Sequence, residues 1–283
     1  MTWYRLSGDV KDMPKVEKKE RQIAWGVSLA LAVVVLITAC IRLWGLPIFD
    51  EYVVLALVIA LFPSAVLDYI DYRWRRSIDE HLPDLYRAIV QSEKTGMTLT
   101  QAVEEASKRR YGPLTAELKR MVAHMSWGKS FEEALQSFGE RVNTSLTKHS
   151  IPLVIEASRS GGRVEKVFEP TGKFVQSTLM AEKERQAQTR PYVAIVYVAF
   201  FVFLFTVIML FTTFFIQMSE LATLNTAVMS TDEARRLFFH MSTAQALFGG
   251  LVAGKMGEGT VSAGLKHSVI LLVCGYVALK LLI

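Results

Sequence analysis

The chain has 283 residues, a formal net charge of +5 and a hydrophobic fraction of 51%, while 21% of its residues are charged. This mixture predicts membrane spans joined to a folded aqueous part. The two cysteines, Cys40 and Cys274, both fall inside long apolar runs, which excludes a disulfide framework and a thiolate metal site.

Five apolar runs are near the length that crosses a hydrocarbon layer of about 30 Å. The strongest, 191–218, carries no charge. At about 1.5 Å per residue it exceeds the layer, so it must tilt or project beyond it. The last run carries Lys280, whose long side chain can reach the membrane interface. We expect spans at 23–41, 52–67, 191–218, 237–253 and 268–283.

Basic residues predict the orientation of these spans. Lysine and arginine are frequent in segment 1–22 and again directly after the second span, whereas the link between the first two spans carries Arg42 beside Asp50 and Glu51. By the positive-inside bias we expect the N-terminus in the cytoplasm and, after five spans, the C-terminus outside. Arg235 and Arg236 fall in an outside loop and count against this orientation.

Residues 71–190, between the second and third spans, are expected to form a cytoplasmic helical bundle. Apolar residues recur at helical spacing in two stripes, and glycine, proline and capping-box residues mark helix ends. The stripes are Leu82, Leu85, Tyr86, Ile89 and Val90, and then Leu114, Leu118, Met121, Val122 and Met125. The boundary signals are Gly96, Thr98 with Gln101, Pro113, and Ser130 with Glu133.

The predicted fold is therefore all-α, a polytopic membrane protein with about five transmembrane helices and a helical bundle inserted between the second and third. We expect a cytoplasmic segment at 1–22, two spans within 23–70, the bundle at 71–190 and three spans within 191–283, with a cytoplasmic glycine-rich loop at 254–267.

A weak repeat runs through the bundle. The segments "GMTLTQAV" from Gly96, "GKSFEEAL" from Gly128 and "GGRVEKVF" from Gly161 recur at the period of helix-pair repeats. Tetratricopeptide arrays share that period, but their tryptophan, glycine and tyrosine pattern is missing here. A repeated unit of helix, glycine turn and capped helix is the better description.

The segments "SEKTGMTLTQAVEEAS", "WGKSFEEALQSFGERV" and "EASRSGGRVEKVFEPTGKFV", followed by a long aromatic span, resemble the cytoplasmic module of the type II secretion F family. The tail "GLVAGKMGEGTVSAGLKHSVILL" is similar to the archaeal branch, the archaellum and pilus assembly J proteins. Archaeal members often carry two such modules and this chain has one, as in the paired subunits of tight-adherence pili. It could be half of a pair, a homodimer or a truncated relative.

The resemblance implies a membrane platform of a type IV pilus-like machine. Such a platform binds a cytoplasmic hexameric ATPase and pilin or archaellin subunits in the bilayer, together with a second platform subunit or a second copy of itself. It couples the ATPase to pilin insertion, and it has no catalytic activity and needs no cofactor. A small transporter or channel subunit is the alternative, but the spans are nearly free of the ionisable residues that transport paths bury.

The residues themselves indicate no catalytic or metal site. No nucleophile has a paired base, no carboxylate pair has a credible spacing, and the histidines are scattered singly, so each is expected to be structural or interfacial. The five are His81, His124, His149, His240 and His267.

The stretch "GGLVAGKM" matches a phosphate-binding loop except at its last letter. Met256 stands where a serine or threonine hydroxyl would hold magnesium, and the run before Gly254 is too long for a strand. We therefore expect no ATP site. The glycines of the 254–267 loop make a turn between two spans, and Lys255, Glu258 and Lys266 in that loop are candidate contacts for the ATPase or for the bundle.

Two further basic clusters are candidate ATPase contacts. They are Arg73, Arg75 and Arg76 after the second span, and Lys108, Arg109 and Arg110 at a predicted helix end. Either cluster alone is explained by membrane orientation or by the helix dipole, and anionic lipid is a further candidate for the charges beside the spans. Together with other exposed cations they fit an acidic protein partner. Nucleic acid is not expected, because no recognition fold accompanies the charge.

Overall fold

The computed structural model describes residues 18–43, 48–159, 165–215 and 231–282. Every regular element within these ranges is helical, which confirms the all-α prediction for the described part of the chain. Contacts between residues divide the chain into two compact units. Unit 1 is Ile70–Arg185, and unit 2 combines the described residues up to Tyr69 with those from Gln186 onward.

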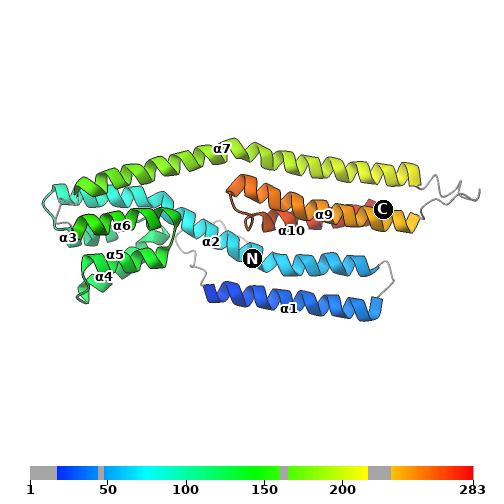
Figure 1. Ribbon diagram of the computed structural model, residues 1–283, viewed down its shortest axis with the longest axis horizontal. Helices are drawn as coiled ribbons and strands as arrows, with labels where there is room; N and C mark the ends of the chain where they lie inside the picture. Colours follow the sequence, from blue (N-terminus) through cyan, green and yellow to red (C-terminus); the bar gives the residue numbers. More distant parts are fainter. Residues whose placement is uncertain (1–17, 44–47, 160–164, 216–230, 283) are drawn as a thin grey trace, which may run out of the picture. The chain divides into compact units, whose positions relative to one another are not determined.

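Two helices belong to both units. Helix α2 (Ile48–Lys94) has 47 residues and α7 (Glu165–Leu210) has 46 (Figure 1). At about 1.5 Å per residue each is roughly 70 Å long, more than twice the hydrocarbon layer of about 30 Å. A helix of this length can cross a bilayer and still continue far into the aqueous phase.

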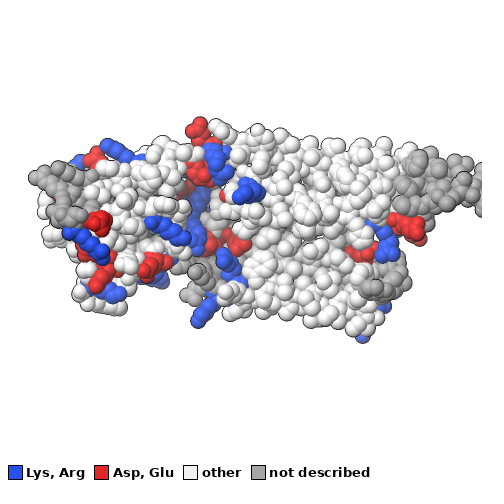
Figure 2. Space-filling model, in the orientation of Figure 1, with Lys and Arg blue, Asp and Glu red and all other residues white. Residues whose placement is uncertain are grey.

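Unit 2 holds helices with membrane-spanning length and composition. These helices are α1 (Lys18–Leu43), α9 (Thr231–Glu258), α10 (Gly264–Leu282) and the apolar parts of α2 and α7. Together they make five, which confirms the predicted number of spans. Helix α7 ends in a π-helical turn, η3 (Phe211–Phe215). Large apolar side chains point outward, among them Ile41 with 77% of its surface exposed and Phe205 with 64%. Figure 2 shows the face over these helices as a broad surface without charged side chains, as a hydrocarbon environment requires.

Unit 1 is a bundle in which short helices follow one another as antiparallel hairpins. Helices α3 (Leu99–Ser107), α4 (Pro113–Ser126), α5 (Phe131–Val142) and α6 (Ser145–Arg159) follow α2 and precede α7 along the chain, and they share unit 1 with the second half of α2 and the first half of α7 (Figure 1). Consecutive pairs of these four helices contact one another.

The turns of the first two repeats have the same geometry. Gly96 and Gly128 have φ of +89° and +90°, a conformation that side chains disfavour. Two residues after each glycine, Thr98 and Ser130 complete capping boxes at the starts of α3 and α5. The predicted caps are confirmed, as is Pro113 in the first turn of α4. The third repeat begins at Gly161, outside the described residues.

Both predicted stripes supply the core of unit 1. Leu82 and Leu114 have no exposed surface, and Tyr86 and Met121 are nearly as buried, while Val122 and Met125 pack at the edge of the cluster. Tyr86 contacts Phe168 of α7 edge to face at 5.6 Å and donates a hydrogen bond to Ser150 of α6 at 2.7 Å. One tyrosine therefore joins α2, α6 and α7.

Helices α9 and α10 form a hairpin whose axes approach unusually closely. A Cβ atom on Gly250 would lie 2.1 Å from the backbone nitrogen of Ser268, and one on Gly254 would lie 2.1 Å from that of Gly264. Ser242 and Ala246 extend this small-residue ladder along α9 at four-residue spacing, and both are buried. Small residues at this spacing are the usual basis of close helix packing in membranes.

This packing corrects the expected extent of the glycine-rich loop. Helix α9 continues to Glu258 and α10 begins at Gly264, so the turn occupies 259–263 rather than 254–267. Gly259 has a positive φ of +79°, whereas Gly254 and Gly264 serve the helix contact. The motif "GGLVAGKM" lies wholly inside α9, so its last three residues are helical and not part of the expected loop.

Candidate functional site

The structure brings the first two basic clusters to the same end of unit 1. The α3–α4 turn reaches α2 at Gly112, where a Cβ atom would lie 3.4 Å from the hydroxyl of Ser77. The α5–α6 turn reaches the same part of α2, because Arg75 donates a hydrogen bond of 2.7 Å to the carbonyl of Asn143. We call this region the basic end of unit 1.

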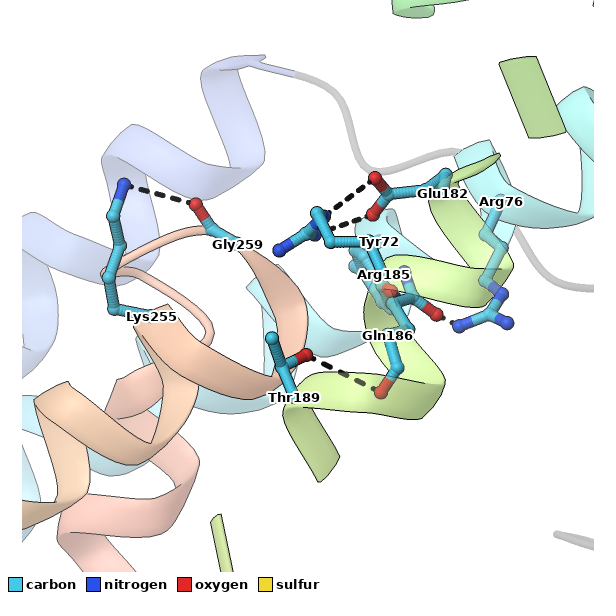
Figure 3. Close-up of polar contacts among 8 residues, drawn as sticks. All are labelled: Tyr72, Arg76, Glu182, Arg185, Gln186, Thr189, Lys255 and Gly259. Atoms are coloured by element: carbon cyan, nitrogen blue, oxygen red, sulfur yellow. Dashed lines mark hydrogen bonds and ion pairs between the residues drawn. The ribbon is translucent and has the colours of Figure 1, made fainter. Parts of the chain in front are cut away.

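Arginines on α2 have local partners at the basic end. Arg75 also forms an ion pair of 2.8 Å with Asp71, so its guanidinium joins its own helix to the α5–α6 turn. Arg76 pairs with Glu80 at 3.2 Å. It also donates a hydrogen bond of 3.2 Å to the Tyr72 hydroxyl (Figure 3). Arg73 has interactions of its own. This cluster has structural roles, and Arg75 is bound most firmly.

The α3–α4 turn presents its cations more openly. Lys108, Arg109 and Arg110 are all exposed. Lys108 pairs with Glu105 at 2.8 Å on the surface, where such a pair contributes little to stability. Their exposure leaves these three side chains the most accessible of the candidate contacts in unit 1.

The third candidate cluster lies at the α9–α10 turn of unit 2. Lys255 donates a hydrogen bond of 3.2 Å to the carbonyl of Gly259 and so caps its own helix (Figure 3). Glu258 forms an ion pair with Lys266, whose ammonium lies 4.8 Å from the centre of the Tyr69 ring. The structure thus joins these two residues to each other and ties α10 to α2.

Two buried polar contacts of unit 1 were missed by the sequence analysis. Glu117 is 4% exposed and lies between Arg120 at 3.0 Å and Arg141 of α5 at 2.9 Å. Asp79 on α2 accepts a hydrogen bond of 2.5 Å from the Thr144 hydroxyl. Burial raises the pKa of Asp79 to about 6, although that hydrogen bond and the charge of Arg75 favour its ionised form.

Each histidine has its own local contact. His81 and His149 bond backbone carbonyls of their own helices at 2.7 Å. His124 stacks on Trp127, and His267 contacts the Tyr197 hydroxyl at 2.8 Å. His240 lies 3.4 Å from Asp50. Among the described residues no group of three metal-ligating side chains comes together.

The part of the chain that forms most of unit 1 and continues along α7 matches a known family. Residues 85–212 match the family model described as type II secretion system (T2SS), protein F. This segment is similar to a type II secretion F domain. Proteins of this family are membrane platform proteins rather than enzymes.

The F domain begins in α2, includes the whole of α3 to α6 and ends within η3. A similar protein is an uncharacterised protein of Methanocaldococcus jannaschii, 23% identical over 234 residues, which are 81% of this chain and 38% of the relative. The chain therefore spans less than half the length of that relative. No solved structure matches the chain.

Proposed function

We propose that this protein is the membrane platform of a type IV pilus-like, archaellum or type II secretion assembly machine. In this role it couples a cytoplasmic hexameric ATPase to the insertion of pilin or archaellin subunits into a filament. The F domain at 85–212 carries the proposal, because its family consists of membrane platform proteins of such systems.

The two long helices suit this role physically. Helix α7 runs from the core of unit 1, through Phe168 and Val175, to the apolar residues of unit 2 without a break. Pro170 and Pro191 lie within this helix, and a proline is a position at which a helix bends most easily. Helix α7 thus connects unit 1 to the spanning helices continuously along the chain, with bending favoured at these two positions.

We further propose that the ATPase docks at the basic end of unit 1. The α3–α4 turn supplies the exposed cations Lys108, Arg109 and Arg110, and the α2 cluster Arg73, Arg75 and Arg76 adjoins it through Ser77 and Gly112. An acidic partner would be attracted to this end over about one Debye length. We propose a second ATPase contact at the α9–α10 turn, formed by Lys255, Glu258 and Lys266. Because these side chains already bind groups within the turn, we expect this contact to depend on the shape of the turn more than on its charge.

A charge-removal experiment tests this docking. Replacing Lys108, Arg109 and Arg110 together with alanine should slow association of the full-length protein with its secretion ATPase and reduce the salt dependence of binding, because rim charges act mainly on the association rate. Surface plasmon resonance at two salt concentrations measures both. Helical content should be unchanged, since none of the three side chains belongs to the core of unit 1.

The matched control removes the same charge elsewhere in unit 1. Lys129, Arg159 and Lys173 are exposed and lie away from the α3–α4 turn. Their replacement with alanine should leave ATPase binding unchanged. Equal losses in both triple variants would mean that net charge alone drives binding, and no loss in either would refute docking at the basic end.

A second platform subunit is a further proposed partner. We propose a homodimer or a pair with a similar platform subunit, which would supply a second F domain. Mass measurement of the detergent-solubilised protein distinguishes a monomer from a dimer.

A further inference from the structure

A groove runs along unit 2 where α2 begins and α10 ends. Its volume is about 590 Å³. Residues at helical spacing on each helix line it, so that one stripe of each helix faces the same space. The stripes are Glu51, Val54, Leu55 and Val58 on α2, and Val273, Tyr276 and Lys280 on α10, with Tyr52 at the rim.

The groove is apolar along most of its length and polar at one end. Leu55 and Val273 are about half exposed, although both lie in apolar spans. At the polar end, Glu51 accepts hydrogen bonds from the Tyr276 hydroxyl at 2.7 Å and from Lys280 at 2.6 Å. The groove thus has the two-part character of an amphiphile, a hydrocarbon length and one charged end.

Further charged groups surround the polar end. The neighbouring Asp50 is nearly buried and holds Arg236 at 2.9 Å, with His240 at 3.4 Å. Arg235 also interacts electrostatically with Glu51. Asp232 and Glu233 lie in the first turn of α9 beside these arginines, so the wider surroundings carry both signs, and Lys280 is the cation that lines the groove itself.

Lys280 is the cation placed to meet a ligand. Its ammonium donates to Glu51 and to the Tyr276 hydroxyl at 2.9 Å, which uses two of its three hydrogens, and its side chain is 56% exposed. The remaining hydrogen of this exposed ammonium favours an anion over a cation at this end of the groove.

The surroundings of the groove supply hydrocarbon as its occupant. The groove lies between α2 and α10, two helices with membrane-spanning length and composition. From Glu51 to Val58 the α2 stripe rises about 10 Å, and a hydrocarbon chain of the bilayer fits along such an apolar length.

We propose that this groove is a binding site for an anionic phospholipid of the bilayer. A hydrocarbon chain lies along Val54, Leu55, Val58 and Val273, and the phosphate accepts a hydrogen bond from Lys280. Bound lipid would hold the beginning of α2 against the end of α10, next to the ion pairs that join α2 to α9.

Native mass spectrometry of the full-length protein in mild detergent tests this site. Phosphatidylglycerol and phosphatidylcholine with identical acyl chains are titrated separately. The wild type should bind one phosphatidylglycerol molecule at least about tenfold more tightly than phosphatidylcholine, since hydrogen bonds to charged groups are the stronger ones. Lys280→Met should remove this preference, and Val58→Trp should fill the groove and abolish binding of both lipids.

Two controls match these variants in chemistry. Lys255→Met removes an exposed lysine at the α9–α10 turn, and Val252→Trp enlarges a valine that is 50% exposed on α9. Both should bind phosphatidylglycerol as the wild type does. Equal affinity for the two lipids, or binding unaffected by both Lys280→Met and Val58→Trp, would overturn the proposal. So would a photo-crosslinker at Val58 that captured a protein helix instead of lipid.

Discussion

Asp79 is a carboxylate that the fold of unit 1 keeps partly out of water. Burial raises its pKa to about 6 from an ordinary value of 3.8. Because the folded-state pKa lies above the unfolded one, the stabilising effect is complete below pH 3.8 and is lost as the pH rises through about 6. Unit 1 should therefore gain stability from this group on mild acidification.

Asp79→Asn removes the titration and keeps an oxygen that can accept the hydrogen bond of Thr144. At pH 7.5 the variant should be more stable than the wild type by about 3 kcal/mol, since the folded and unfolded pKa values differ by about two units and one unit corresponds to about 1.4 kcal/mol. Near pH 4 the difference should nearly vanish. Thermal unfolding of the detergent-solubilised protein at both pH values measures this, and a difference independent of pH would contradict the assigned pKa.

Glu117 is a second buried carboxylate of unit 1, and it lies between two arginines. Glu117→Ala should destabilise unit 1 by about 3 kcal/mol, because it breaks a buried ion pair with Arg141 and leaves the Arg120 pair unmade. The control is Glu105→Gln, which disrupts the exposed pair with Lys108 and should change the unfolding temperature little. If the two variants unfold alike, the Glu117 contacts are not the stabilising ones.

Residues that pack through local periodicity were predictable from sequence, and residues that pair across the fold were not. Leu82, Leu114 and the capping residues Thr98 and Ser130 follow helical spacing and end signals that occur within a few residues. Glu117 with Arg141 and Asp79 with Thr144 are joined only by the tertiary fold. No pattern in the sequence brings such partners together.

At the scale of the element, the α9–α10 hairpin depends on glycines that the sequence presents as a phosphate-loop motif. Gly250→Ala would force a Cβ atom into the backbone of α10 at Ser268, and we expect a loss of about 3 kcal/mol or more in stability. The matched control is the adjacent Gly249→Ala, whose Cβ atom would meet Val196 at an ordinary 3.6 Å. It should be neutral, or more stable by up to about 1 kcal/mol.

This pair of substitutions also separates two interpretations of the motif. A phosphate-binding loop would depend on Gly249 as its first glycine, whereas helix packing depends on Gly250 and Gly254. Proteolysis and thermal unfolding of both variants should show loss of stability for Gly250→Ala alone. Loss in the Gly249 variant with magnesium-dependent ATP binding by the wild type would reinstate the nucleotide site.

The hairpin also shows why a glycine-rich segment is difficult to interpret from sequence. Glycine serves both a left-handed turn, as at Gly259, and a close approach of two helices, as at Gly254. The sequence does not distinguish these two uses of glycine, because the distinction depends on the residue at which the helix ends. Here the helix continued four residues past Gly254, so the expected loop was too long.

At the scale of the whole molecule, α2 and α7 connect the helical bundle of unit 1 to the five spanning helices along the chain. The number of spans and the place of the bundle between the second and third followed from hydropathy alone, because an apolar run of sufficient length has few alternatives. The arginines at 235 and 236 counted against the predicted orientation. In the structure Arg236 forms an ion pair with Asp50. Arg236 is therefore a weaker argument against the predicted orientation than an arginine without a carboxylate beside it would be.

The side of the membrane on which unit 1 lies tests the account most directly, because a cytoplasmic ATPase can dock only on a cytoplasmic surface. In a variant with Cys40 and Cys274 replaced by serine, single cysteines are placed at the exposed positions Trp127 in unit 1, Thr260 in the α9–α10 turn and Asp232 at the beginning of α9. A membrane-impermeant maleimide should label Asp232→Cys in intact cells, and should label Trp127→Cys and Thr260→Cys only after the membrane is opened. Labelling of Trp127→Cys in intact cells would place unit 1 outside and contradict the platform function.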